Sequence, residues 1–147
     1  MLNINAEILS TWNKNNALYN WAATKIGVSY AEMMVLYALA SIENPTQKQI
    51  SENFGMQKQT VNSIVKNLKE KGYIKFLPSK KDKREKITVL TDEGKNYTKT
   101  IIAPLLEAEN KALKAMGKAN VQKMQETLEM YNLLLEKEIE RSINNER

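Results

Sequence analysis

The hydrophobic residues of this chain recur mainly at spacings of three and four, which is the pattern of amphipathic helices. The clearest apolar stripe lies between Gly55 and Gly72, and the opposite side of that segment is almost wholly polar. The members of the stripe are Val61, Ile64, Val65 and Leu68. Similar spacings predict three long helices, over residues 4–25, 92–116 and 118–143, and two shorter ones that begin after Ser29 and Thr46.

Capping signals mark where several of these helices begin and end. Two pairs, Ser29 with Glu32 and Thr46 with Gln49, have the spacing of a capping box, in which each side chain bonds the other residue's backbone N–H. Thr91 precedes two acidic residues, which favour the positive start of a helix. Glycines follow four of the helical patterns, where a left-handed residue is wanted. These glycines are Gly27, Gly55, Gly72 and Gly117.

The hydrophobic period changes between Gly72 and Thr91. Residues 73–77 alternate and contain two aromatic side chains, and residues 87–90 form a second short apolar run, so two strands are expected. A polar, charged turn over residues 78–86 joins them. The predicted fold class is therefore mainly α (α+β), in which a pair of helices is followed by a short β-hairpin.

Positive charge is concentrated in the middle of the chain. The segment 48–86 contains 11 Lys and Arg residues and four Asp and Glu residues, a net charge of +7. The remainder holds 11 basic and 13 acidic residues, a net charge of −2. A charge gathered in one part of a protein indicates where a polyanion would bind.

The two short helices separated by a glycine turn form a predicted helix-turn-helix, whose second helix can enter the major groove of DNA. Its polar face carries side chains that suit this role, since amides can bond adenine bidentately and Lys can reach guanine or phosphate. These candidates are Gln57, Lys58, Gln59, Thr60, Asn62, Ser63 and Lys66. A polar helix face can equally be a solvated surface, but the adjoining basic hairpin favours nucleic-acid binding.

The tip of the hairpin is a second candidate site. Its residues are Lys80, Lys81, Asp82, Lys83 and Arg84. Such a tip can follow the phosphates and insert a guanidinium into the minor groove, which makes Arg84 the preferred candidate. Asp82 would pair with Arg84 or a nearby base and fix the shape of the tip. Any one of the lysines could instead belong to an ordinary soluble loop.

Composition narrows the functional classes. The chain has no Cys and no His, which removes thiolate metal sites, disulfides, the commonest metal ligand and the commonest general base. No acidic cluster accompanies a nucleophile or a glycine-rich phosphate loop, so we expect no enzyme, no cofactor and no metal. There is no run of 18 apolar residues and no signal-peptide pattern at the start, so we expect a cytoplasmic protein without a membrane partner.

Three short motifs in order resemble the MarR family of bacterial transcription regulators. They are Leu68-Lys69-Glu70-Lys71-Gly72-Tyr73, Asp82-Lys83-Arg84 and Leu90-Thr91-Asp92-Glu93-Gly94. The resemblance implies a winged helix-turn-helix lobe over residues 29–94. It also implies a helical dimerisation region, residues 1–28 and 95–147, in a single intertwined domain. The long amphipathic terminal helices point to a homodimer independently, because their apolar surface needs a partner.

The same resemblance implies binding to a pseudo-palindromic operator in double-stranded DNA, usually repression, and frequently release by a small-molecule effector. Where the family often has a Ser or Thr that caps the recognition helix, this chain has Gly55 or Met56. Aromatic residues are candidates for an effector pocket, and core or dimer packing is the alternative role for them. These are Trp12, Tyr19 and Tyr37, with Trp21 and Tyr30 near them in the sequence. A winged-helix protein-interaction module that binds no DNA is the alternative function.

Overall fold

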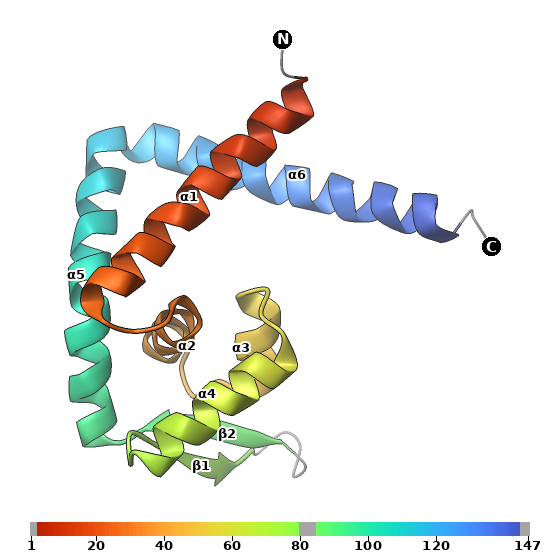
Figure 1. The fold of residues 1–147 in the computed structure, drawn as a ribbon. Coiled ribbons are helices and arrows are strands. Elements are labelled where there is room, and N and C mark those ends of the chain that lie inside the picture. Colours follow the sequence, from red (N-terminus) through yellow and green to blue (C-terminus); the bar gives the residue numbers. More distant parts are fainter. Residues whose placement is uncertain (1–2, 80–84, 145–147) are drawn as a thin grey trace. The chain divides into compact units, whose positions relative to one another are not determined.

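Six helices and two strands make up the part of the chain that the computed structural model describes, residues 3–79 and 85–144. In chain order they are α1 (Ile4–Ile26), α2 (Tyr30–Ser41), α3 (Gln47–Asn53), α4 (Lys58–Glu70), β1 (Ile74–Pro78), β2 (Lys86–Leu90), α5 (Asp92–Met116) and α6 (Lys118–Asn144) (Figure 1). The type and order of the predicted elements are confirmed. The chain divides into two units, Met1–Leu105 and Leu106–Arg147.

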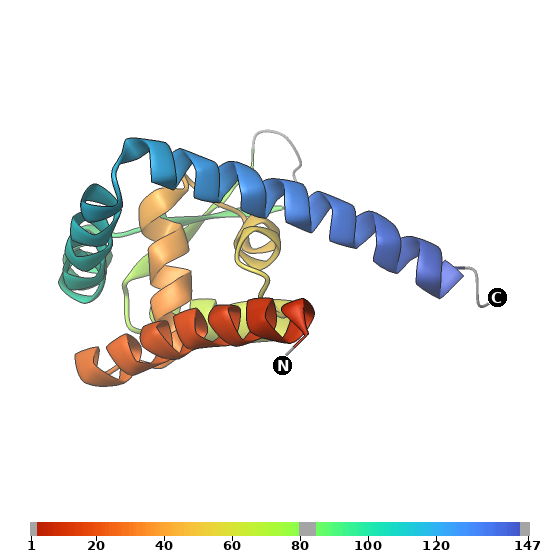
Figure 2. The same ribbon diagram turned by 90° about the horizontal axis from the view of Figure 1, so that it is seen from above.

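The core of the first unit is built around α2. This helix is apolar on nearly all sides, as expected of a helix that is surrounded by protein, and it contacts α1, α3, α4 and β2. Figure 2 views α3 end-on, beside α2. Side chains with almost no exposure fill the space between these elements. They include Met33, Val35 and Leu36 of α2, Ile50 of α3, Val61, Val65 and Leu68 of α4, and Ile102 of α5.

Two capping boxes were predicted, and one is complete. At the start of α3, the Gln49 backbone N–H donates to Thr46 Oγ1 at 3.2 Å, and the Thr46 backbone N–H donates to Gln49 Oε1 at 2.9 Å. At the start of α2, Ser29 Oγ accepts from the Glu32 backbone N–H at 3.0 Å. The Glu32 carboxylate, however, accepts a hydrogen bond from the hydroxyl of Tyr97 on α5. The second box is therefore only half formed, because a distant residue binds its carboxylate.

The two strands form an antiparallel hairpin. Its register runs from Ile74 opposite Leu90 to Pro78 opposite Lys86. Pro78 and Lys86 were expected in the turn, and they instead close the ends of the strands. A contact that the sequence did not predict holds the hairpin to the start of α3: the Thr88 backbone N–H donates to the Pro45 carbonyl at 2.8 Å, and Thr46 bridges Ile87.

The second unit consists of the end of α5, from Leu106, and of α6. Every described side chain of α6 is exposed except Val121, which is half-buried. The predicted apolar face of α6 lies among these exposed residues, including Met124, Leu128, Tyr131, Leu135 and Ile139. None of the helices over the described ranges is both long and apolar enough to cross a membrane.

Candidate nucleic-acid interface

The recognition helix α4 begins at Lys58. Gln57 is the N-cap residue, with an extended backbone (φ −66°, ψ 137°), and its side chain makes no capping hydrogen bond. Neither Gly55 nor Met56 is the cap, and Gln57, which was predicted on the recognition helix, stands just before it. The first backbone N–H groups of α4 therefore have no side-chain cap, and such groups at a helix start favour an anion.

The predicted division of α4 into two faces is confirmed. Val61, Val65 and Leu68 are fully buried, whereas the opposite face is polar and open to solvent. Its exposed members are Lys58, Gln59, Asn62, Ser63 and Lys66, and Thr60 is half-buried at its edge. Lys66 lies 4.0 Å from the Glu70 carboxylate, an exposed pair that contributes little to stability and leaves the ammonium accessible.

A tight turn fixes α4 against α3. Gly55 adopts a positive φ of 58°, a conformation that glycine adopts without steric cost. Ser51 Oγ donates to the Met56 carbonyl at 2.6 Å, and the Met56 backbone N–H donates to the Ser51 carbonyl at 2.9 Å. Because Ser51 is itself buried, these two bonds anchor the turn in the core. The turn presents the polar face of α4 in one orientation.

A groove of about 360 Å³ lies along α3 and α4. The residues that line it all carry polar or charged side chains, and they are Gln47, Lys48, Lys58, Gln59 and Asn62. Gln47 and Lys48 lie between the two residues of the α3 capping box, Thr46 and Gln49, and were not predicted as candidates for nucleic-acid binding. The first residues of α3 are polar in the sequence, but this indicates a binding role only once α3 is known to pack beside α4.

Two further cations that sequence reasoning missed lie at the base of the hairpin. Lys69 Nζ, from α4, is 5.0 Å from the centre of the Phe76 ring, and Lys86 Nζ, from β2, is 5.8 Å from it. Cations at such distances from an aromatic ring are attracted to its face. The predicted tip residues Lys80, Lys81, Asp82, Lys83 and Arg84 lie outside the described residues.

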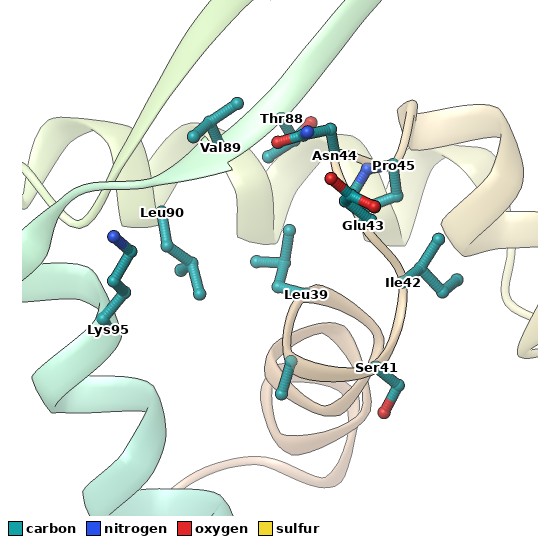
Figure 3. Close-up of a pocket in the computed structure, with 11 residues that line it drawn as sticks. Leu39, Ser41, Ile42, Glu43, Asn44, Pro45, Thr88, Val89, Leu90 and Lys95 are labelled. Carbon is teal, nitrogen blue, oxygen red and sulfur yellow. The ribbon is translucent and has the colours of Figure 1, made fainter.

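The aromatic residues predicted for an effector pocket come from two helices. Trp12 and Tyr19 belong to α1 and Tyr37 to α2, where its ring is tilted against Phe54 with centroids 6.0 Å apart. A different cavity, of about 380 Å³, lies between the loop after α2, strand β2 and the start of α5 (Figure 3). Its lining includes Leu39, Pro45, Thr88, Leu90 and Lys95, and none of the three aromatic residues. The aromatic pocket remains a prediction.

Over residues 3–79 and 85–144 no three or more Asp or Glu side chains come together in a group that could hold a metal ion. The features that the structure brings together are the polar face of α4, the groove along α3 and α4, and a hairpin that follows α4 directly. This arrangement defines a winged helix-turn-helix protein.

Comparison with known proteins agrees with this class. The model of the MarR family matches residues 26–85. The MarR family regulator NMB1585 from Neisseria meningitidis has the same fold, with a TM-score of 0.87 and 25% identity over 96% of this chain and 99% of that one. Over residues 26–85 the chain is similar to the MarR family.

Two curated relatives match a shorter stretch. The uncharacterized HTH-type transcriptional regulator YwoH of Bacillus subtilis (strain 168) is 33% identical over 87 residues, 59% of this chain and 63% of that protein. The HTH-type transcriptional regulator SarZ of Staphylococcus haemolyticus (strain JCSC1435) is 27% identical over 85 residues, 58% of each chain. The match thus spans about three fifths of each curated relative.

Proposed function

We propose that the protein is a homodimeric, sequence-specific DNA-binding regulator of the cytoplasm, without catalytic activity, which represses transcription from a pseudo-palindromic operator. The observation that carries the proposal is the exposed polar face of α4, placed opposite the buried side chains of Val61, Val65 and Leu68 and beside a groove lined by Gln and Asn residues and two lysines. The similarity of residues 26–85 to the MarR family, and of the whole fold to the MarR family regulator NMB1585, supports the same role.

In this proposal α4 lies in the major groove. The amides of Gln59 and Asn62 bond base edges, and the ammonium groups of Lys48, Lys58 and Lys66 bind phosphates. The basic segment 80–84 adds phosphate contacts, and Arg84 enters the minor groove. Each phosphate that a lysine neutralises releases counterions, so the affinity for DNA should fall steeply with salt.

The exposed apolar residues of α1 and α6 support a second copy as the dimer partner. Trp12 of α1 is 42% exposed, and Leu135 and Ile139 of the predicted α6 face are 41% and 47% exposed. Exposed apolar residues that recur on one face of a helix mark an interaction site. Two-fold symmetry would set the two α4 helices about 34–36 Å apart, one turn of duplex DNA.

A small-molecule effector that releases the operator completes the proposal. Structures that share the fold contain small molecules: CouR from Rhodococcus jostii RHA1 is bound to p-coumaroyl-CoA, and MarR from Staphylococcus aureus is in complex with salicylate and kanamycin. In this chain Trp12, Tyr19 and Tyr37 are the proposed lining of the effector site. Release of a bound operator duplex by an aromatic compound, with loss of that effect in Tyr37→Ala, tests this part.

Selection from a pool of random duplexes tests the central claim. The wild-type protein should enrich a two-fold symmetric sequence. Asn62→Ala should relax the preference at one position of each half-site, at a cost of about 1–3 kcal/mol in discrimination. Asn96→Ala, an exposed asparagine on α5, is the matched control and should leave the sequence unchanged. An identical selected sequence for Asn62→Ala and wild type would contradict base contact by α4, and no enrichment by the wild type would refute the proposed function.

A further inference from the structure

A row of exposed polar residues on α4 continues to the end of that helix. Asn62, Lys66 and Lys69 follow one another at spacings of four and three, which makes them neighbours on the helix surface. All three side chains are exposed. Lys69 lies in the last turn of α4, and α4 contacts strand β1 of the hairpin. The row therefore leads from the polar face of α4 to the hairpin.

Phe76 of β1 brings Lys69 close to a second lysine, which comes from β2. Side chains two positions apart share one face of a strand, so the half-buried Phe76 lies on the same side of β1 as the buried Ile74. Lys69 Nζ is 5.0 Å from the centre of the Phe76 ring, and Lys86 Nζ is 5.8 Å from it. The two ammonium groups thus lie around one ring, where the end of α4 meets the hairpin.

These two ammonium groups differ from most others of known pairing in having no acidic partner in the described part of the chain. Over residues 3–79 and 85–144, five cations pair with an acid three or four positions away, namely Lys48, Lys66, Lys95, Lys111 and Arg141. Lys69 and Lys86 form no ion pair within these ranges. Like charges that lie near each other repel, and an anion that binds both offsets this repulsion. Each ammonium also offers three hydrogen-bond donors, which suit the oxygens of a phosphate.

Placement of α4 in the major groove, as proposed above, gives this pair of lysines a defined neighbour. The major groove and the adjacent minor groove of a duplex are separated by one sugar–phosphate backbone. A protein that has a helix in one groove and a hairpin tip at the other faces that backbone with the residues between the two. Lys69 at the end of α4 and Lys86 at the start of β2 have this position.

We propose that Lys69 and Lys86 form a phosphate site for the DNA backbone between the two grooves, so that α4 and the hairpin bind the same strand. The proposal rests on the proposed function above, and it adds two contacts to those of the polar face of α4 and of segment 80–84. Contacts to phosphate carry no base identity. The pair should therefore fix the position of α4 in the groove and leave the selected sequence unchanged.

The salt dependence of binding to the selected duplex counts the phosphate contacts. The logarithm of the affinity changes linearly with the logarithm of the salt concentration, with a slope of about −0.9 for each neutralised phosphate. Lys69→Gln and Lys86→Gln each remove one contact from both protomers of the proposed dimer. Each variant should therefore make the slope shallower by about 2.

Lys75→Gln is the matched control for these two variants. Lys75 is an exposed lysine of the same hairpin, but its side chain lies on the face of β1 opposite to Phe76, because faces alternate along a strand. The substitution changes the net charge by the same amount. Its slope should stay within about 0.5 of the wild-type value.

Neutral phosphates show whether the partner is the DNA backbone itself. A set of duplexes carries a methylphosphonate, which lacks the negative charge of a phosphate, at one pair of symmetry-related positions at a time. At one or two such positions, the replacement should weaken binding of the wild type by about five- to tenfold. The same duplexes should weaken binding of Lys69→Gln or Lys86→Gln by less than about twofold, because the interaction is already absent.

The outcomes distinguish this proposal from the proposed function. If the wild type selects a sequence, but Lys69→Gln and Lys86→Gln keep its slope and its response to every methylphosphonate, the phosphate site is refuted and the regulator stands. A purely structural effect would weaken binding to all duplexes alike and keep that response, which would also refute the site. So would an equal change of slope in Lys75→Gln, because overall charge would then explain it. If the wild type selects no sequence, the proposed function fails, and the phosphate site fails with it.

Discussion

Replacing Thr91 by Val should destabilise the fold by more than its single hydroxyl suggests. Thr91→Val keeps the shape and the β-branch but removes both bonds of Oγ1, the cap from the Gly94 N–H and the bond to the Gly72 carbonyl. Loss of a helix N-cap costs about 1 kcal/mol. Loss of the second bond adds about 0.5–1.5 kcal/mol. The free energy of unfolding should therefore fall by about 1.5–2.5 kcal/mol.

Urea unfolding at one fixed chain concentration measures this change, because the stability of an associating protein depends on concentration. Thr100→Val is the matched control. Its Oγ1 donates to the Asn96 carbonyl at 3.0 Å within α5 and joins no second element, so its loss should cost no more than about 0.5 kcal/mol. Equal unfolding free energies for the two variants would refute the reasoning that Thr91 joins α4 to α5.

Three further predictions concern charge, assembly and DNA. The pKa of Tyr97 is raised from 10.0 to about 12, so its protonated form stabilises the native state below pH 10. The free energy of unfolding of wild type should therefore exceed that of Tyr97→Phe below pH 10, and this difference should shrink as the pH rises through 12. A difference in urea midpoints that stays constant with pH would contradict this. Leu135→Glu should halve the mass measured by light scattering, because Leu135 lies on the predicted dimer face of α6. Leu133→Glu, on the opposite side of α6, should leave the dimer intact. If both variants dissociate, or neither does, the predicted face of α6 is not the dimer interface. Arg84→Ala should cost about 1–3 kcal/mol in DNA affinity, and unchanged operator binding in a gel-shift assay would argue against the minor-groove contact.

Local patterns explain why most of the fold could be predicted. Periodic apolar residues fixed the buried stripe of α4, and glycines with positive φ, such as Gly55 and Gly72, marked where helices end. Alternation predicted β1, and a short apolar run predicted β2, to within one residue at every end. The polar face of α4 followed from the same periodicity, since whatever is not buried on a two-faced helix is presented to solvent.

Contacts between distant residues account for what the sequence did not predict. Glu32 has the spacing of a local cap, but its carboxylate bonds Tyr97, 65 positions away. Thr46 was expected only to cap α3, and it also bridges Ile87. The reason for Gly94 becomes visible only when the Tyr73 carbonyl is placed beside it. Lys48 could be identified as a binding candidate only from the packing of α3 beside α4, because local sequence spacing does not encode that packing.

The ring of Phe76 has an effect on two charges at once. Lys69 and Lys86 come from different elements, α4 and β2, and each ammonium lies near the Phe76 ring. Phe76→Leu would leave the net charge of the protein unchanged. It would remove the cation–π contacts of both lysines, so each side chain would sample more conformations in solvent. Phe76, although uncharged, thereby restricts the positions of two ammonium groups.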